Sequence, residues 1–112
     1  MIKQEQFNLI WNHFVVNKSP KSIKGDDNVL YNEEEGTKCA IGLLIPEEKY
    51  YQKLETTPSW DLIDKIPELS NLTLKEFHTL QQAHDFAPDE TFHVSIEKNL
   101  REIAEEFKLT IP

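Results

Sequence analysis

Apolar residues recur at helical spacing near the start of the chain. The positions three or four residues apart are Phe7, Ile10, Trp11, Phe14 and Val15. Residues between them are mostly polar, so the apolar side chains share one face of a helix. The pattern predicts an amphipathic helix over residues 3–17, before the break at Ser19-Pro20.

Two helices are predicted in the middle of the chain by their starting signals. Thr57-Pro58 has the form of an N-cap followed by proline at the first helical position. In the helix that follows, Trp60, Ile63 and Ile66 share a face, and we expect Trp60 to be a core residue. The segment 73–76, Thr-Leu-Lys-Glu, matches a capping box and starts a helix expected to run to about Ala87.

The last helix has the clearest pattern. Its apolar positions are spaced by four, three and four residues: Ile96, Leu100, Ile103 and Phe107. Glutamate, lysine and arginine occupy the positions between them, as expected on a solvated face. The sequence allows this helix to begin as early as Asp89.

One β-hairpin is predicted between the first two helices. Residues 29–32 and 37–40 form its strands, and the polar segment 33–36 forms the turn. The apolar run 41–45 either extends the second strand or begins a short buried helix, because its length does not decide between them. Gly42 within this run indicates close approach to a neighbouring backbone.

These elements predict a mainly α fold (α+β) of about four helices and one small β-hairpin, forming a single compact domain over residues 1–112. The chain is 38% hydrophobic, which is enough for one modest core. We expect no membrane span, because no apolar run reaches about 18 residues. The first residues contain no apolar signal segment, and the single cysteine forms no internal disulfide, so the expected location is cytoplasmic.

The charge balance is acidic. The formal net charge is −8, from 20 acidic and 12 basic residues. Such a surface repels phosphate backbones at long range, so no nucleic-acid partner is expected. Acidity is also compatible with simple solubility or with binding to a basic partner surface.

A sequence block around the only cysteine resembles a family of small uncharacterised bacterial and phage proteins. The block is residues 38–46, Lys-Cys-Ala-Ile-Gly-Leu-Leu-Ile-Pro, and it is followed by a similar Leu-Gln-x-x-His-Asp at residues 80–85. The resemblance covers nearly the whole chain and implies a shared fold without an assigned activity. The turn Glu33-Glu34-Glu35-Gly36 departs from the arginine, glycine and proline that are more usual there.

Cys39 and His84 are the candidate catalytic pair. A thiol nucleophile requires a nearby base and is often activated at a helix N-terminus. His84 would act as the base, and Asp85 is the candidate carboxylate to orient it. Adjacent helical residues point about 100° apart, so Asp85 does not orient His84 automatically. The alternative is that Cys39 simply packs and that His84 is a core histidine bonded to a backbone carbonyl.

No metal site or cofactor is expected. The four histidines show no H-x-x-x-H or H-E-x-x-H spacing, and C-x-x-C is absent. The glycines fit neither the phosphate loop nor the dinucleotide fingerprint.

The candidate binding residues lie on the hairpin and just after the cysteine block: Tyr31, Lys38, Glu48, Tyr50 and Tyr51. Tyrosine is common among interface anchors, which favours a protein contact through the hairpin and residues 47–51. The first hypothesis is therefore a small acidic protein-interaction domain with an accessory or host-interaction role. The alternatives are a cysteine-dependent hydrolase using Cys39 and His84, and a small-ligand module with residues 41–45 as an apolar wall beside Tyr31 and Lys38.

Overall fold

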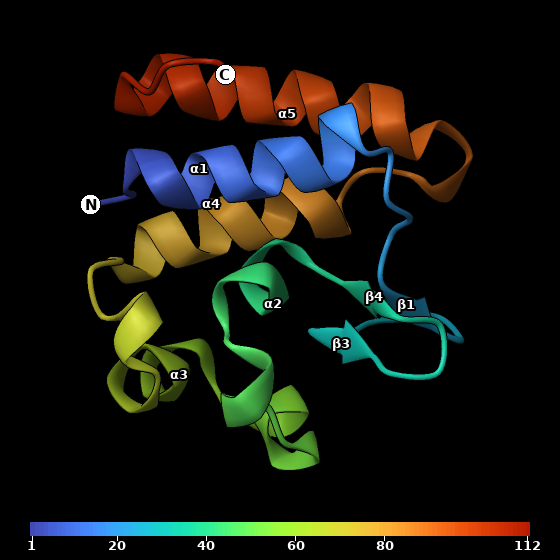
Figure 1. Cartoon of the computed structure of the whole chain (residues 1–112), viewed down its shortest axis with the longest axis vertical. Helices are drawn as coiled ribbons and strands as arrows, with labels where there is room; N and C mark the ends of the chain where they lie inside the picture. The colour runs from blue at the N-terminus through green and yellow to red at the C-terminus, as the bar shows by residue number, and fades with distance from the viewer.

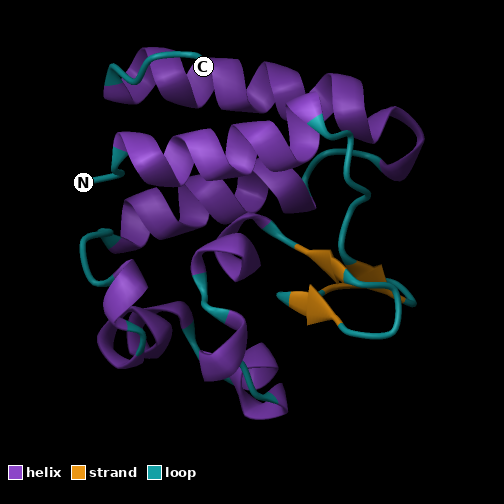
Figure 2. Cartoon of the chain, viewed as in Figure 1, coloured by secondary structure: helices purple, strands orange, loops and turns teal.

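The computed structural model describes residues 1–112 and contains five α-helices and two small antiparallel sheets (Figures 1 and 2). The helices are α1 (Gln4–Trp11), α2 (Ala40–Leu44), α3 (Ser59–Lys65), α4 (Leu74–Asp85) and α5 (Phe92–Phe107). The strands are β1 (Ile23–Lys24), β2 (Asp27–Asn28), β3 (Tyr31–Asn32) and β4 (Thr37–Lys38). The predicted mainly α class is confirmed. No helix combines the length and apolar character required to cross a membrane.

Helices α1, α4 and α5 lie side by side as the main layer (Figure 1). Helix α1 continues into a π-helical turn over Asn12–Val16, so the helical region nearly matches the predicted 3–17. Phe14 in this turn contacts Phe92 of α5 edge to face, with ring centroids 5.5 Å apart. It also lies 5.6 Å from the ring of His84 in α4. The aromatic contacts therefore join all three helices at one end of the layer.

Helix α4 begins as its sequence predicts. The Thr73 hydroxyl accepts the Glu76 amide at 3.1 Å, and the Glu76 carboxylate accepts the Thr73 amide at 2.9 Å. This capping box satisfies two amides of the first turn. The helix ends at Asp85 rather than Ala87. The Lys21 ammonium binds the Asp85 and Ala87 carbonyl oxygens at this end, as a cation does at a helix C-terminus.

Helix α3 differs from the sequence prediction. It begins at Ser59, and the Thr57 hydroxyl donates to the Lys53 carbonyl instead of capping α3. Leu62 and Ile66 provide its buried face, whereas Trp60 is 60% exposed. The assignment of Trp60 to the core was therefore wrong. A helix of two turns has too few apolar positions to define its buried face by spacing alone.

The last helix, α5, begins at Phe92 after a 3₁₀ turn at Asp89–Thr91. Its predicted apolar positions Ile96, Leu100 and Ile103 are buried, and Phe107 is partly buried against the core. The long amphipathic pattern therefore predicted the buried face correctly.

The predicted hairpin consists of β3 and β4, which pair Tyr31 with Lys38 and Asn32 with Thr37. Each strand is shorter than predicted. A second hairpin, β1–β2, was not predicted, and it is joined to the first by the Asn32 amide, which donates to the Ile23 carbonyl at 2.8 Å. The two hairpins pack beside the helical layer at one end of the molecule (Figure 2).

The apolar run after β4 forms the short buried helix α2, which settles the alternative between strand and helix. Gly42 lies in this helix against Leu30: a Cβ at position 42 would be 2.2 Å from the Leu30 carbonyl oxygen. The predicted close backbone approach at Gly42 is therefore confirmed. Helix α2 packs against α4 and α1, which places the cysteine block in the centre of the core.

Candidate functional site

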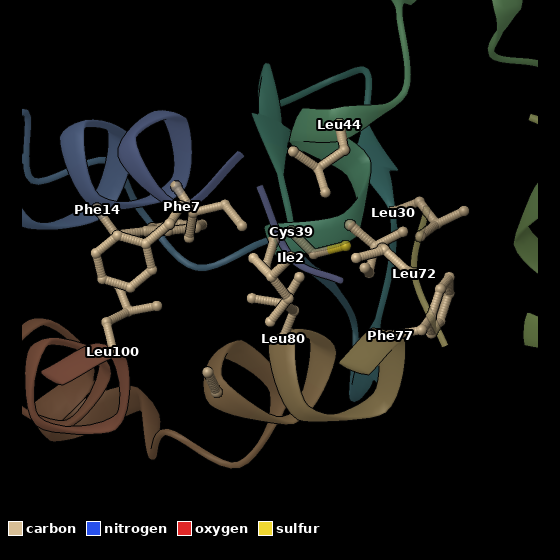
Figure 3. Packing of buried hydrophobic residues seen from close by; sticks show 14 of the residues in the cluster. Ile2, Phe7, Phe14, Leu30, Cys39, Leu44, Leu72, Phe77, Leu80 and Leu100 are labelled. Carbon is tan, nitrogen blue, oxygen red and sulfur yellow. The ribbon is translucent and has the colours of Figure 1, made fainter. Parts of the chain in front are cut away.

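Cys39 is the N-cap residue of α2 and is completely buried. Its Sγ accepts the Gly42 amide at 3.3 Å and donates to the Gln81 side-chain oxygen at 3.2 Å. Figure 3 shows the Cys39 side chain among apolar core residues that include Ile2 and Leu80. The cysteine thus performs the part that serine or threonine usually performs at the start of a helix.

Burial disfavours the thiolate of Cys39. It raises the pKa of the thiol from 9.0 to about 12, even though the bonds from Gly42 and to Gln81 act in the opposite direction. The nearby charge of Asp85 adds to the increase in pKa. A thiolate is the reactive form of cysteine, so the thiol in this setting is a weak nucleophile near neutral pH.

His84 and Asp85 are joined directly. Nδ1 of the fully buried His84 lies 2.7 Å from Oδ1 of Asp85, and Nε2 accepts the Ser22 backbone amide at 2.9 Å. A backbone amide can only donate, so the imidazole is neutral and carries its proton on Nδ1. The alternative expectation of a bond from His84 to a backbone carbonyl was wrong. Asp85 holds this tautomer despite its neighbouring position on the helix.

Gln81 and Asp85 separate the predicted nucleophile from the predicted base. The Gln81 amide nitrogen lies 3.2 Å from each Asp85 oxygen, while its oxygen accepts from Cys39 and from the Ile41 amide. No hydrogen bond joins Cys39 to His84. The resulting chain of bonds fixes α2 to α4. Gln81 was missed by sequence reasoning, although it lies in the Leu-Gln-x-x-His-Asp block.

A second group of residues forms a tyrosine–lysine cluster, which we define as Tyr31, Lys38 and Tyr50. The two tyrosine rings stack with centroids 4.1 Å apart and planes 6° apart. The Lys38 ammonium lies 4.8 Å from the centre of the Tyr31 ring and 2.8 Å from the Glu47 carboxylate. The structure thus brings three of the five predicted binding residues together.

Glu55 holds the tyrosine–lysine cluster in place by three hydrogen bonds. Its carboxylate accepts the Leu30 amide at 2.9 Å, the Tyr31 amide at 3.0 Å and the Tyr50 hydroxyl at 2.6 Å. The Tyr31 hydroxyl donates to the Ile45 carbonyl. Burial, followed by the hydrogen bond to Glu55 and its charge, raises the pKa of Tyr50 well above its ordinary value. The sequence did not predict this role of Glu55, because nothing in its pattern distinguishes Glu55 from the other polar residues around it.

The remaining predicted binding residues, Glu48 and Tyr51, lie at the surface, and Tyr51 is 50% exposed. Burial, and to a smaller extent the charges of Glu47 and Glu48, raise the pKa of Tyr31, and the charge of Glu33 adds to the raised pKa of Tyr50. We call the exposed group formed by the turn and this segment the acidic surface. Its members are Glu33, Glu34, Glu35, Glu47, Glu48 and Tyr51.

The apolar run 41–45 packs inward. Ile41 and Ile45 are essentially inaccessible and Leu44 is buried, so their side chains belong to the main core. The residues also contain no group of three or more histidine, cysteine, aspartate or glutamate side chains placed to hold a metal ion. In comparisons with known proteins, no family model, curated protein or solved structure matches the chain.

Proposed function

We propose that this protein is a protein-interaction domain whose contact surface is the acidic surface. The observation that carries the proposal is the stack of Tyr31 on Tyr50. It joins the β3–β4 hairpin to the segment 47–51, two regions separated by α2 in the chain. The stack therefore links the two regions that the sequence marks as candidate contacts, through Tyr31 of the hairpin and Tyr50 of the segment.

The charge of this surface favours a basic partner. Glu47 pairs with Lys38, and Glu34 makes only an exposed pair with Lys24 at 3.7 Å. The other carboxylates, Glu33, Glu35 and Glu48, pair with no basic side chain. Like charges held close together create a negative potential that speeds association with a positively charged protein.

Tyr51 supplies a large apolar contact among these carboxylates. An aromatic side chain with a polar tip gains from burial at an interface and loses little conformational freedom. Tyr51 is half exposed, whereas its neighbour Tyr50 is held by the stack and by Glu55. An accessory or host-interaction role in bacteria or phage rests on the resemblance of the cysteine block, and it is part of the proposal on that basis alone.

Capture from a native lysate tests the proposal. The bait is the full chain with a tag at the C-terminus, since the N-terminal ammonium pairs with Glu76. We expect a stoichiometric partner with wild type and its loss with Glu33→Gln/Glu35→Gln/Glu48→Gln or with Tyr51→Ala. The matched control neutralises three exposed, unpaired carboxylates elsewhere, Glu90→Gln/Glu102→Gln/Glu105→Gln. Failure to capture a stoichiometric partner, or equal capture by both triple variants, contradicts the proposal.

A further inference from the structure

Ser59 and His78 form a polar contact between α3 and α4. The Ser59 Oγ lies 3.1 Å from His78 Nε2, across a separation of 19 residues in the chain. When the hydroxyl donates and Nε2 accepts, the imidazole is placed to remove the hydroxyl proton. This is the contact between nucleophile and base that serine-dependent acyl transfer requires.

Ser59 also lines a small surface pocket of about 160 Å³. Four apolar side chains form much of its lining: Leu30, Leu54, Leu62 and Phe77. Pockets for drug-sized ligands usually occupy about 300–1,000 Å³, so this one suits a short acyl group rather than a long chain.

Asn28 is among the residues that line the same pocket, and its side-chain amide has no hydrogen-bond partner in the protein, whereas the Gln81 amide is bound to Asp85. A side-chain amide that can donate is suited to stabilise an oxyanion as negative charge develops on a carbonyl oxygen. The pocket therefore brings together a nucleophile and a candidate oxyanion donor, with a base in contact with the nucleophile.

We propose that Ser59, His78 and Asn28 form a site that hydrolyses small esters with short acyl groups. Ser59 Oγ attacks the ester carbonyl carbon while its proton passes to His78 Nε2. The carbon–oxygen bond to the alcohol breaks, and the alcohol leaves with that proton. Water then attacks the acyl-serine with His78 as base, which releases the carboxylic acid and regenerates Ser59. No carboxylate orients Nδ1 of His78, so the site favours esters with good leaving groups.

Hydrolysis of p-nitrophenyl acetate and labelling by a fluorophosphonate probe test this proposal. We expect the probe on Ser59 by peptide mass spectrometry, and loss of both label and hydrolysis in Ser59→Ala. His78→Gln should lower the acylation rate about 100-fold. Asn28→Ala should lower the rate by a similar factor of about 100.

Two controls and a rescue separate this site from structural effects. Ser70→Ala and His93→Gln change a serine and a histidine elsewhere and should leave hydrolysis unchanged. Ser59→Cys keeps a nucleophile beside His78, and its new thiol should react with iodoacetamide faster than a free cysteine. The proposal is overturned if Ser59→Ala hydrolyses the ester as fast as wild type, if the probe labels another residue, or if the Ser59→Cys thiol reacts no faster than free cysteine.

Discussion

Tyr50 stacks on Tyr31 and at the same time donates its hydroxyl to Glu55, which itself holds the Tyr31 backbone. The ring and the hydroxyl of Tyr50 therefore hold the segment around Tyr50 against strand β3 by two different interactions. Tyr50→Phe keeps the stack and removes one hydrogen bond to a carboxylate, which should lower the free energy of unfolding by about 1.5 kcal/mol. Tyr50→Ala removes both and should cost about 2 kcal/mol more.

Urea unfolding measures the stability of both Tyr50 variants, and capture of the partner measures the effect of each variant on binding. If the stack organises the acidic surface, Tyr50→Ala weakens capture while Tyr50→Phe retains it. Equal stabilities of the two variants would show that the ring contact contributes nothing.

Gly42 is required by the close approach of α2 to Leu30. The Cβ of Gly42→Ala would lie 2.2 Å from the Leu30 carbonyl oxygen, so backbone must move. We expect a loss of about 3 kcal/mol in unfolding free energy, at the upper end of overpacking effects. Gly36→Ala is the comparison, since position 36 has open space but a φ of +70°. Its conformational cost should be only about 1 kcal/mol, and similar costs for both variants would contradict the packing role of Gly42.

The raised pKa of Cys39 makes stability depend on alkaline pH. The unfolded thiol ionises from about pH 9, whereas the folded thiol remains protonated until about pH 12. The contribution of Cys39 is therefore complete below pH 9 and is lost progressively as the pH rises toward 12. Cys39→Ser does not ionise in this range, so its stability should fall less steeply with pH than that of wild type.

Alkylation by iodoacetamide checks directly whether the Cys39 thiol is buried and unreactive in the native protein. Native protein should resist modification, and urea-unfolded protein should react as an ordinary cysteine. Rapid modification of the native thiol with an apparent pKa below about 8.5 would instead support the cysteine-dependent hydrolase predicted as an alternative from the sequence.

Glu76 connects the N-terminal ammonium to the start of α4. Burial opposes its charge, but the Thr73 amide and the ammonium of Met1, 3.4 Å away, hold the pKa of Glu76 below its ordinary value. Its stabilising contribution is present above the unfolded pKa and is lost as the pH falls through the folded pKa. Glu76→Gln should lower the unfolding free energy at neutral pH by about 2 kcal/mol and flatten its dependence on acidic pH.

Thr73→Ala is a useful companion to Glu76→Gln, because it removes only the other half of the capping box. We expect it to cost about 1 kcal/mol, with the acid dependence largely retained. Chemical denaturation between pH 3 and 7 compares the variants, and an unchanged acid dependence in Glu76→Gln would contradict the assigned role.

Local patterns predicted much of the fold, whereas the contacts within the candidate sites are non-local. The capping box at Thr73 and the period of α5 are encoded within a few residues, so both were predicted correctly. Gly42 also signalled its close contact, although not its partner Leu30. By contrast, the bond of Gln81 to Cys39 and those of Glu55 to the hairpin join residues far apart in the sequence. Hydrophobic periodicity contains no information about such pairs.

The two tryptophans provide the sharpest test of how the core was assigned. Trp11 is 4% exposed, and its ring lies 6.1 Å from that of Phe7 and 5.1 Å from the Arg101 guanidinium carbon. Trp11→Ala should therefore cost about 3–5 kcal/mol. Trp60→Ala removes a ring that is 60% exposed and should change stability by no more than about 0.5 kcal/mol. Acrylamide should quench the fluorescence of Trp11→Phe, which retains Trp60, more strongly than that of Trp60→Phe. A large loss of stability in Trp60→Ala, or the reverse order of quenching, would place Trp60 in the core after all.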